Sequence, residues 1–534
     1  MESYSSLPFL HKWPLSSISS SPTSIAATLL IVACFTIVFL YRITTTNSRS
    51  KHNDLKAPPK YPGAWPLMGH LRLFGGSNPA HVTLANMAEK YGSTPFMIRF
   101  GQWPTLVVSS SDTVKECFNN TNDKLFSNRT ITRGIRDMFY DMNAFGFASY
   151  GSYWRELRKV LVLTLLSPSR VDSVIQLKAP QFNGWFKKLY EECTNKKSGI
   201  VEMKSWLEVM MFNVLASMVV LPKDEGSIEK FRPVLAESVE VMGKMCIDDL
   251  IPRLGWLDHF TGLVKQCKVT GKKLDTILNS WLEDHRDEKV ADEEKGMIGK
   301  LLSMKEGSKL LGHEGDTAVK ANILGLLLGA GDSAGSTLTW AIVLLLNHPR
   351  MMERLREELD SVVGKHRQVE DADVKNFTYL QAILKETMRL YPVATILLRE
   401  TPEDCVVAGC HIAAGTRLMV NVWQVQRDPN VWSDPLEFKP DRFQMESAHV
   451  DFSGQYSELI PFGTGRRMCP AITLSVRVML LTLARLIHSF DMKIPNGESS
   501  VDTSIMTVGV GFGNLKLTPL EIELLPRLDS KIYG

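Results

Sequence analysis

The sequence carries little net charge of either sign and no paired cysteine motif. Its 61 lysine and arginine residues nearly balance 58 aspartate and glutamate residues, so the formal net charge is only +3. A charge this small gives no electrostatic reason to expect a nucleic acid partner. The cysteines are scattered without a C-x-x-C pair, which favours reduced thiols over a disulfide framework. They are Cys34, Cys117, Cys193, Cys246, Cys267, Cys405, Cys410 and Cys469.

Two further absences narrow the possible functions. The sequence has no glycine-rich motif for a flavin or nicotinamide cofactor, so electrons for any redox reaction would come from a separate protein. It also has no long linker after residue 70, and 44% of its 534 residues are hydrophobic. Although the length alone would allow about three domains, this composition favours one large fold.

An uncharged apolar run near the N-terminus predicts a membrane anchor. It covers the 17 residues 25–41, and a helix of this length spans roughly 26 Å, enough for a thin endoplasmic-reticulum bilayer. Five basic residues and one acid follow it up to residue 60, which places the rest of the chain in the cytosol. Residues 1–24 would then be lumenal, and residues 67–534 would form a cytosolic domain. A cleaved signal peptide is the alternative, but such a run would begin earlier.

Residues 42–66 are predicted to be a basic linker followed by a proline-rich hinge. Pro58, Pro59, Pro62 and Pro66 each fix the backbone φ angle, which predicts a stiff, extended connector. A ligand for an SH3-type domain is the alternative interpretation, because such ligands have a similar proline-rich composition. The position directly after an anchor favours a connector that holds the cytosolic domain at a set angle to the membrane.

The most informative segment is the loop 461–470, which reads PFGTGRRMCP. A thiolate that binds iron needs nearby positive charge and backbone N–H donors to remain deprotonated. Gly463 and Gly465 allow the backbone to fold closely around a sulfur atom. Cys469 precedes an apolar helical stretch at 472–487, and the amides at a helix N-terminus favour a negative sulfur. The alternative is a buried structural cysteine beside a basic glycine turn.

The spacing of Phe462, Gly465, Arg467 and Cys469 resembles the cysteine loop of the haem-thiolate monooxygenases, the cytochrome P-450 superfamily. The resemblance implies that Cys469 is the axial ligand of haem b iron, where a thiolate favours O–O bond cleavage. It also implies that Phe462 and Arg467 contact the haem, the latter through a carboxylate. The sequence departs from the family at Ala471, where glycine is usual; the added methyl leaves the ligand in place.

A second feature is the apolar stretch 319–347, which the segment GAGDSAG interrupts at 329–335. A transmembrane helix is one interpretation of its length, but Asp332 in mid-run favours a core helix with a functional buried acid. Oxygen activation needs protons delivered through ordered water, and an acid beside a hydroxyl can supply them. The superfamily pattern therefore implies catalytic roles for Asp332 and Ser333. Because Ser333 stands where threonine is usual, we expect a working relay with some leakage of reduced oxygen.

Trp154 and Arg158 lie four residues apart, on one face of a predicted helix. An exposed basic helix face would show the same pattern. The superfamily motif Trp-x-x-x-Arg implies instead that both side chains contact a haem carboxylate, and the resemblance gives Arg399 the same role. The neighbouring Arg155 and Lys159 are expected on the surface, where they would help to dock an acidic electron donor.

Glu386 and Arg389 have the Glu-x-x-Arg spacing of the superfamily, which places opposite charges on one helix face. The same spacing occurs at 283–286 and 353–356, where solvated surface pairs are expected. What distinguishes Glu386 is its context, because the segment FKPDRF with Arg442 follows about fifty residues later. The resemblance implies that Glu386, Arg389 and Arg442 form a buried, fully paired triad with a structural role.

The resemblance covers residues 57–534. Within it, the sequence of residues 454–462 is similar to that of plant family 82 of this superfamily. It implies a mainly α fold with small β-sheets behind the single N-terminal transmembrane helix. It also implies a monooxygenase that uses O2 and receives NADPH electrons through a separate NADPH–cytochrome reductase.

The expected substrate is a small hydrophobic plant metabolite. A benzylisoquinoline-type alkaloid is preferred over a terpenoid or a flavonoid, by analogy with the family alone. The expected pocket residues are Phe145, Phe147, Ala330, Ile396 and Phe512, although plain core packing is an equal alternative for each aromatic side chain.

Two other functional classes fit parts of the pattern. A haem-thiolate isomerase or dehydratase that uses no O2 would be expected to lack the acid–hydroxyl pair. This chain has the pair as Asp332 and Ser333, with serine in place of the usual threonine. An inactive membrane-anchored scaffold would be expected to lose Cys469 or Arg467, and both residues are present.

Overall fold

The computed structural model describes residue 36 and residues 55–533. Within the second range it leaves out residues 93, 196–198, 221–225, 287–295, 308–314, 331–332, 509–511 and 517. The predicted anchor at 25–41 therefore lies outside the described residues, apart from Thr36. The chain divides into two units, Met1–Leu55 and Lys56–Gly534. The helices and strands with described bounds all lie in the second unit.

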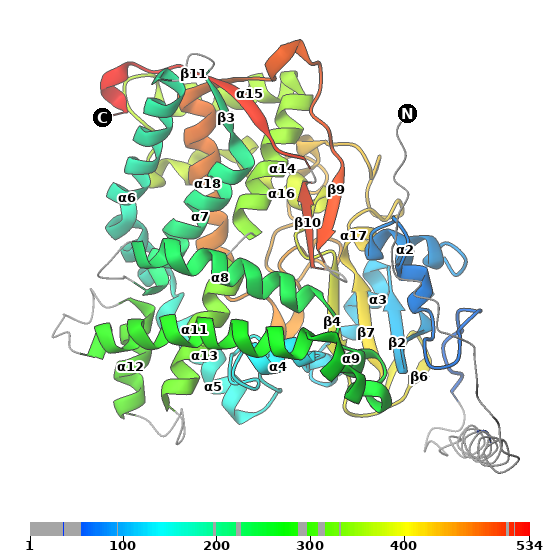
Figure 1. Ribbon diagram of the computed structural model, residues 1–534. Coiled ribbons are helices and arrows are strands. Elements are labelled where there is room, and N and C mark those ends of the chain that lie inside the picture. Colours follow the sequence, from blue (N-terminus) through cyan, green and yellow to red (C-terminus); the bar gives the residue numbers. More distant parts are fainter. Residues whose placement is uncertain are drawn as a thin grey trace, which may run out of the picture. The chain divides into compact units, whose positions relative to one another are not determined.

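Helices form most of the second unit, and the strands are short (Figure 1). This architecture confirms the prediction of a mainly α fold with small β-sheets. The helices are α2 (Ala80–Ala88), α3 (Ser111–Cys117), α4 (Arg133–Met138), α5 (Ser152–Val160), α6 (Pro168–Asn195), α7 (Met203–Val220), α8 (Gly226–Gly243), α9 (Ile247–Leu250), α10 (Asp258–Thr261), α11 (Leu263–Arg286), α12 (Met297–Gly307), α13 (Gly315–Ala330), α14 (Ser333–Asn347), α15 (Pro349–Val363), α16 (Thr378–Leu390), α17 (Val422–Val425) and α18 (Ile472–Ser489).

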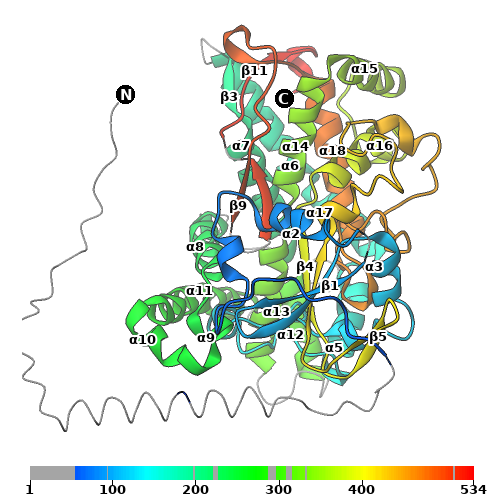
Figure 2. The ribbon, with the colours of Figure 1, turned by 90° about the vertical axis from the view of Figure 1, so that its right-hand side faces the viewer.

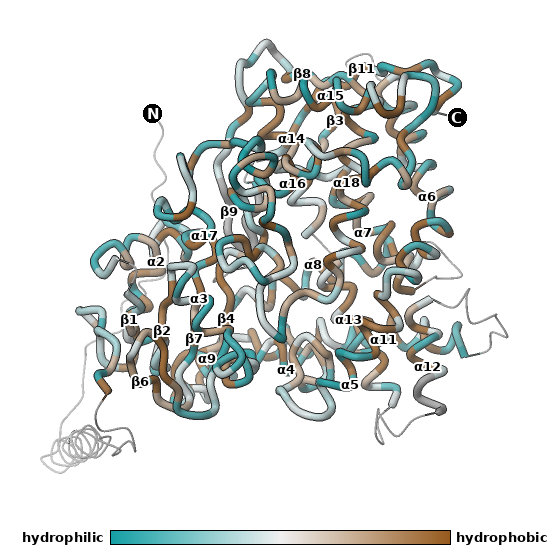
Figure 3. The backbone as a smooth tube through the Cα atoms, turned by 180° about the vertical axis from the view of Figure 1, so that it is seen from behind, coloured by the Kyte–Doolittle hydropathy of each residue, from teal (hydrophilic) through white to brown (hydrophobic). Residues whose placement is uncertain are grey.

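The core lies where α7, α14, α16 and α18 pack together (Figure 1). Residues 334–346 of α14 are all buried, as expected of a helix that is hydrophobic on every face. Trp340 of α14 stacks on Tyr391, with ring centroids 4.0 Å apart. The hydrophobic colour runs along α7, α14 and α18 in Figure 3. Because α14 and most of α13 are enclosed by protein, the described parts of the apolar stretch 319–347 lie in two core helices and not in a membrane span.

Among the described residues, two helices are long and apolar enough to cross a membrane by length and composition, α7 and α18. Both are largely buried inside the unit, with 78% of the α7 window and 72% of the α18 window covered. Their hydrophobicity is therefore accounted for by core packing.

A four-stranded sheet lies beside the helical core, in the strand order β1-β2-β7-β4 (Figure 2). Its strands are β1 (Phe96–Phe100), β2 (Trp103–Val108), β4 (Ile396–Glu400) and β7 (Arg417–Asn421). Strands β2 and β7 are parallel and the other neighbours are antiparallel. The predicted hinge lies against this sheet, because the Tyr61 N–H donates to Met97 O at 2.8 Å and the Met97 N–H donates to Pro59 O at 2.8 Å.

The remaining strands form three smaller sheets. They are β5 (Cys405–Val407) with β6 (Cys410–Ile412), β9 (Ile505–Val508) with β10 (Phe512–Lys516), and β11 (Glu521–Pro526) between β3 (Ile200–Glu202) and β8 (Phe490–Lys493). Strand β8 directly follows α18, so the third sheet covers the end of that core helix.

Candidate active site around Cys469

Cys469 lies at the end of a tight loop, three residues before α18 begins. The Cys469 N–H donates to Phe462 O at 3.0 Å, and the Met468 N–H donates to Gly465 O at 3.0 Å. Gly463 and Gly465 have φ angles of +75° and +68°, a region that residues with a Cβ atom rarely adopt. These two glycines therefore let the chain close around the sulfur, as the sequence predicts.

Gly465 is also required by a close neighbour. A Cβ atom at this position would lie 2.3 Å from Asp123 Oδ1. The close approach of the loop to Asp123 allows a hydrogen bond, because the Arg466 N–H donates to the same carboxylate oxygen at 3.1 Å. A short 3₁₀ helix, η8 (Gly465–Arg467), results and fixes the loop against the segment that contains Asp123.

The thiol of Cys469 is half-buried and lies in a positive environment. Burial raises the pKa of this thiol, whereas a hydrogen bond from the Ala471 N–H and the charges of Arg158 and Arg129 act to lower the pKa. Ala471 has a φ angle of −98°, which any residue can adopt, so alanine in place of glycine causes no backbone strain here. Phe462 is a half-buried residue of this loop and packs edge-on against Phe452, with ring centroids 5.4 Å apart.

Arg467 connects the cysteine loop to the short 3₁₀ helix η2 (Leu125–Ser127) and to the segment that precedes α5. Its Nε donates to Ser127 O at 2.6 Å, its Nη1 donates to Phe145 O at 3.1 Å, and its Nη2 donates to Ala148 O. The guanidinium also lies 4.5 Å from the ring centroid of Trp154. The structure thus joins Arg467 and Trp154, two residues that the sequence predicts to lie near the haem.

Trp154 is buried in α5, and its indole N–H donates to Phe145 O at 3.1 Å. Arg158 lies one turn further along the same helix and is half-buried, whereas Arg155 and Lys159 are exposed, as predicted. Burial lowers the pKa of Arg158, and the Cys469 thiol acts in the opposite direction. The positive field at the sulfur therefore comes from Arg158 of α5 and from Arg129, which precedes α4.

Arg129 was not identified from the sequence, although the structure places it in the same cluster. Burial, together with the charge of Arg158, lowers its pKa, while the Cys469 thiol acts to raise it. Arg399 in β4 is buried, and burial with the charges of Arg129 and Arg467 lowers its pKa well below the usual value. The Nε atoms of Arg129 and Arg399 are buried and have no hydrogen-bond partner among the described residues.

The cluster fits a bound dianion. Four guanidinium groups gather here, those of Arg129, Arg158, Arg399 and Arg467. Burial and the charges of Arg129 and Arg158 lower the pKa of Arg467 to about 9. The Cys469 thiol and the Asp123 carboxyl are the acidic groups that act on them. Haem b has two carboxylates, which would balance this charge and satisfy the buried Nε donors.

The junction of α13 and α14 is described only in part, and Asp332 lies outside the described residues. Ser333 is half-buried at the first position of α14, and its hydroxyl donates to Gly329 O at 2.9 Å. Ala330 is the last residue of α13 and is half-buried. The hydroxyl of Ser333 therefore bridges the two helices at the predicted interruption.

Glu386, Arg389 and Arg442 form the predicted triad in the structure. Arg389 donates from Nε and Nη2 to the two carboxylate oxygens of Glu386 at 2.7 and 2.9 Å, and Arg442 Nε donates at 3.2 Å. All three side chains are buried. By contrast, the acids of the pairs 283–286 and 353–356 are 68% and 66% exposed, as predicted for solvated pairs.

The predicted pocket residues lie on different elements. Phe145 and Phe147 belong to the segment between α4 and α5, and a Cβ atom at Gly325 of α13 would lie 3.6 Å from the Phe145 ring. Phe147 packs edge-on against Phe139, with centroids 5.4 Å apart. Ile396 is buried at the start of β4. Phe512 begins β10, but its side chain lies outside the description.

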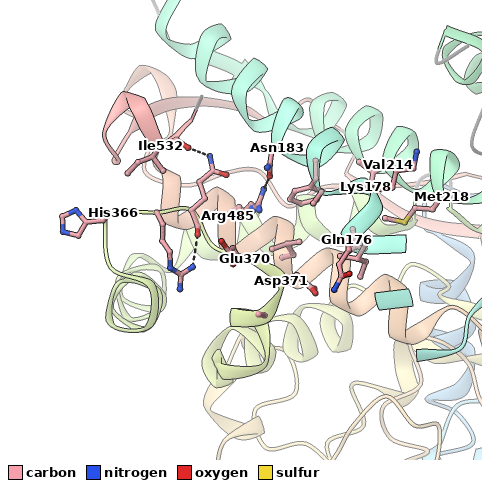
Figure 4. Close-up of a pocket in the computed structure, with 18 of the residues that line it drawn as sticks. Gln176, Lys178, Asn183, Val214, Met218, His366, Glu370, Asp371, Arg485 and Ile532 are labelled. Carbon is pink, nitrogen blue, oxygen red and sulfur yellow. Dashed lines mark hydrogen bonds between the residues drawn. The ribbon is translucent and has the colours of Figure 1, made fainter. Parts of the chain in front are cut away.

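A cavity of about 740 Å³ lies elsewhere, between α6, α18 and the 3₁₀ helix η6 (Asp371–Asn376). Asn183 and Arg485 meet in its lining, where Arg485 Nη1 donates to Asn183 Oδ1 at 2.6 Å, and Figure 4 shows the two side chains close together. None of the predicted site residues lines this cavity. It is therefore separate from the site at Cys469.

The mainly helical fold and the closed loop before α18 are the arrangement that the resemblance to haem-thiolate proteins implies. Residues 59–519 match the family model of Cytochrome P450, and the chain belongs to this family. It is 43% identical over 525 residues to protopine 6-monooxygenase of Papaver somniferum, with 94% of this chain and 96% of the relative covered. It is also 43% identical over 502 residues to (S)-N-methylcanadine 1-hydroxylase CYP82Y1 of the same plant, with 88% and 89% covered.

Solved structures support the fold. A structure of zebra fish cytochrome P450 with abiraterone is similar at a TM-score of 0.69 and 22% identity, covering 84% of this chain and 99% of the other. Together, these relatives confirm the predictions of plant family 82 and of a cytochrome P-450 monooxygenase. Family membership also implies a haem iron cofactor, which the residues around Cys469 fit.

Proposed function

We propose that this protein hydroxylates a benzylisoquinoline-type alkaloid, using O2 and electrons from NADPH. The observation that carries the substrate class is the similarity, along nearly the whole chain, to enzymes named for protopine and N-methylcanadine. The observation that carries the chemistry is the cysteine loop, with its buried arginine cluster. When bound, haem iron would supply the activation of O2 and the oxidation of a C–H bond.

Each residue of the site has a role in this proposal. The Cys469 sulfur holds the iron, and the Ala471 N–H with the charges of Arg129 and Arg158 stabilises the thiolate form. Arg129 and Arg399 bind the haem carboxylates through their buried, unpartnered Nε donors. Arg467 and Trp154, which are also expected near the haem carboxylates, hold the cysteine loop to α5 by sharing the Phe145 carbonyl.

Proton delivery is proposed for the junction of α13 and α14. The Ser333 hydroxyl lies at this junction, and the carboxyl of Asp332 precedes it in the sequence. A hydroxyl can donate and accept at once, so Ser333 can pass a proton from the acid to an ordered water molecule. The serine lacks the methyl group that would restrict its rotamer, which would permit some uncoupled reduction of oxygen.

The electron donor and the membrane location are also proposals. A separate NADPH–cytochrome reductase would supply the electrons, and the exposed Arg155 and Lys159 of α5 suit an acidic partner. The apolar residues 25–41 would anchor the chain as a single span of the endoplasmic reticulum, with residues 67–534 in the cytosol.

The test is product formation in microsomes that contain the full chain and a plant reductase. Protopine, (S)-N-methylcanadine, a terpenoid and a flavonoid are offered with NADPH, and mass spectrometry detects the gain of one oxygen atom. We expect an alkaloid product that requires NADPH and is absent in Cys469→Ala. A product from the terpenoid or flavonoid alone would overturn the substrate class, and a product that persists in Cys469→Ala would overturn the chemistry.

A further inference from the structure

The segment 139–148, between α4 and α5, has an unusual backbone. Tyr140, Asp141 and Met142 are consecutive and have φ angles of +54°, +47° and +69°. Residues other than glycine seldom adopt this left-handed region, and a run of three persists only where surrounding contacts enforce it. The same segment contains Phe145 and Phe147, two of the three aromatic residues predicted to contact substrate. Contacts that hold this backbone therefore also set the positions from which both side chains project.

The first set of contacts holds Tyr140 between two long helices. The Tyr140 hydroxyl donates to Asp275 Oδ1 of α11 at 2.7 Å. Lys320 Nζ of α13 donates to the same oxygen at 2.5 Å and to Asn279 Oδ1 at 3.0 Å, and it lies 5.2 Å from the Tyr140 ring centroid. Burial acts to raise the pKa of Asp275, but hydrogen bonds from Lys320 and Tyr140 outweigh it and lower the pKa. The charge-assisted bonds therefore persist at neutral pH.

The second set of contacts holds Phe145 from two sides. The Asn322 side chain of α13 is buried; its Oδ1 accepts from the Phe145 N–H at 2.9 Å, and its Nδ2 donates to Asn143 O at 3.3 Å. On the other side, Phe145 O accepts from Trp154 and Arg467. The peptide of Phe145 is thus tied both to α13 and to the cysteine loop.

We infer that Tyr140, Asp275, Lys320 and Asn322 form a loop clamp that determines where Phe145 and Phe147 stand in the substrate pocket. Its members are positioning residues: they hold the backbone of 139–148 between α11 and α13, and the two phenylalanines hold the substrate. The clamp fixes which carbon of a polycyclic substrate is oxidised. This inference rests on the proposed function for its consequence, but the positioning itself is independent of the substrate.

The first test is hydrogen exchange on the full-length haem-loaded protein in detergent. Lys320→Met removes the shared cation, and Lys320→Arg retains a cation. Lys273→Met is the matched control, because it removes a more exposed ion pair, Lys273 to Glu237 at 2.8 Å, from α11, the helix that contains Asp275. We expect amides of 140–148 to exchange about tenfold faster in Lys320→Met, with partial rescue by arginine and no change in the control. Equal exchange in wild type and Lys320→Met would overturn the clamp.

The second test measures the pocket with a probe that needs no turnover. Binding of 4-phenylimidazole is followed by the haem absorption spectrum, and we expect its dissociation constant to change about fivefold or more in Lys320→Met. The reduced carbon monoxide spectrum should stay that of the wild type. An unchanged dissociation constant would show that the segment does not shape the pocket.

Regioselectivity is then compared with (S)-N-methylcanadine as substrate. A changed ratio of hydroxylated products in Lys320→Met, with Lys273→Met like the wild type, is the expected result. An unchanged ratio would overturn the role in selectivity. If the wild type oxidises no alkaloid, the proposed function fails, while the exchange and phenylimidazole results still decide whether the clamp positions the loop.

Discussion

Replacing Glu386 by alanine leaves two buried guanidinium groups without their counter-charge. Glu386 and Arg389 are 0% exposed and Arg442 is 3% exposed, so water cannot replace the lost carboxylate. Arg389 keeps its bonds to the backbone oxygens of Gln426, Pro435 and Glu437, but carbonyl groups do not neutralise its charge. Removing one partner of a buried ion pair costs about 3–5 kcal/mol. We expect Glu386→Ala to lower the free energy of unfolding by about this amount.

The chain supplies a matched control for this change. Glu353 has the same Glu-x-x-Arg spacing, but its side chain is 66% exposed and lies 3.7 Å from Arg356. Exposed pairs contribute about 0–1 kcal/mol, so Glu353→Ala should leave the stability nearly unchanged. Both variants are compared with the wild type by urea unfolding of the full-length protein, followed by tryptophan fluorescence.

The comparison refutes the reasoning if Glu386→Ala and Glu353→Ala shift the urea midpoint equally. Glu386→Gln separates charge from volume, because the amide nearly preserves the shape of the side chain. We expect it to destabilise less than alanine and more than Glu353→Ala, since its oxygen can still accept one of the arginine hydrogen bonds. A glutamine variant as stable as the wild type would show that the charge of Glu386 is dispensable.

Three further predictions concern the site itself. Arg467→Lys should lower haem retention during gel filtration at least tenfold, because an ammonium group cannot donate at once to the three carbonyl oxygens that Arg467 contacts. Haem retention equal to that of the wild type would contradict this prediction. Gly465→Ala should lose more haem-loaded protein than Gly463→Ala, because its Cβ would lie 2.3 Å from Asp123 Oδ1 and that of Gly463 no closer than 3.9 Å to its neighbours; equal yields would count against the steric argument. Ser333→Ala should release several-fold more hydrogen peroxide per NADPH oxidised, and an unchanged ratio would exclude the hydroxyl from proton delivery.

Sequence reasoning succeeded where the constraint is short in range. The thiol loop needs Gly463, Gly465 and Cys469 within a few residues of each other, and the structure gives both glycines positive φ angles. Glu386 and Arg389 are one helical turn apart, so their pairing is visible in the spacing. The addition of Arg442, whose bond to Glu386 spans 56 residues, depended on the family resemblance.

The contacts that sequence reasoning missed join distant parts of the chain. Asn322 and Phe145 are 177 residues apart, and Arg467 and Phe145 are 322 apart, so no periodicity connects them. Arg129 has no motif of its own and is identified only by the arginines around it. The proline-rich segment at 57–66 was read from its composition, which contains no information about the backbone hydrogen bonds between Tyr61 and Met97.

The central claim is that Cys469 holds a haem iron as its thiolate ligand. The reduced carbon monoxide difference spectrum tests it directly, because its absorption maximum depends on whether the ligand is a thiolate. Cys410, a half-buried cysteine in β6, provides the control. We expect the wild type and Cys410→Ala to give the thiolate spectrum and Cys469→Ala to lose it. A thiolate spectrum that persists in Cys469→Ala would contradict the account.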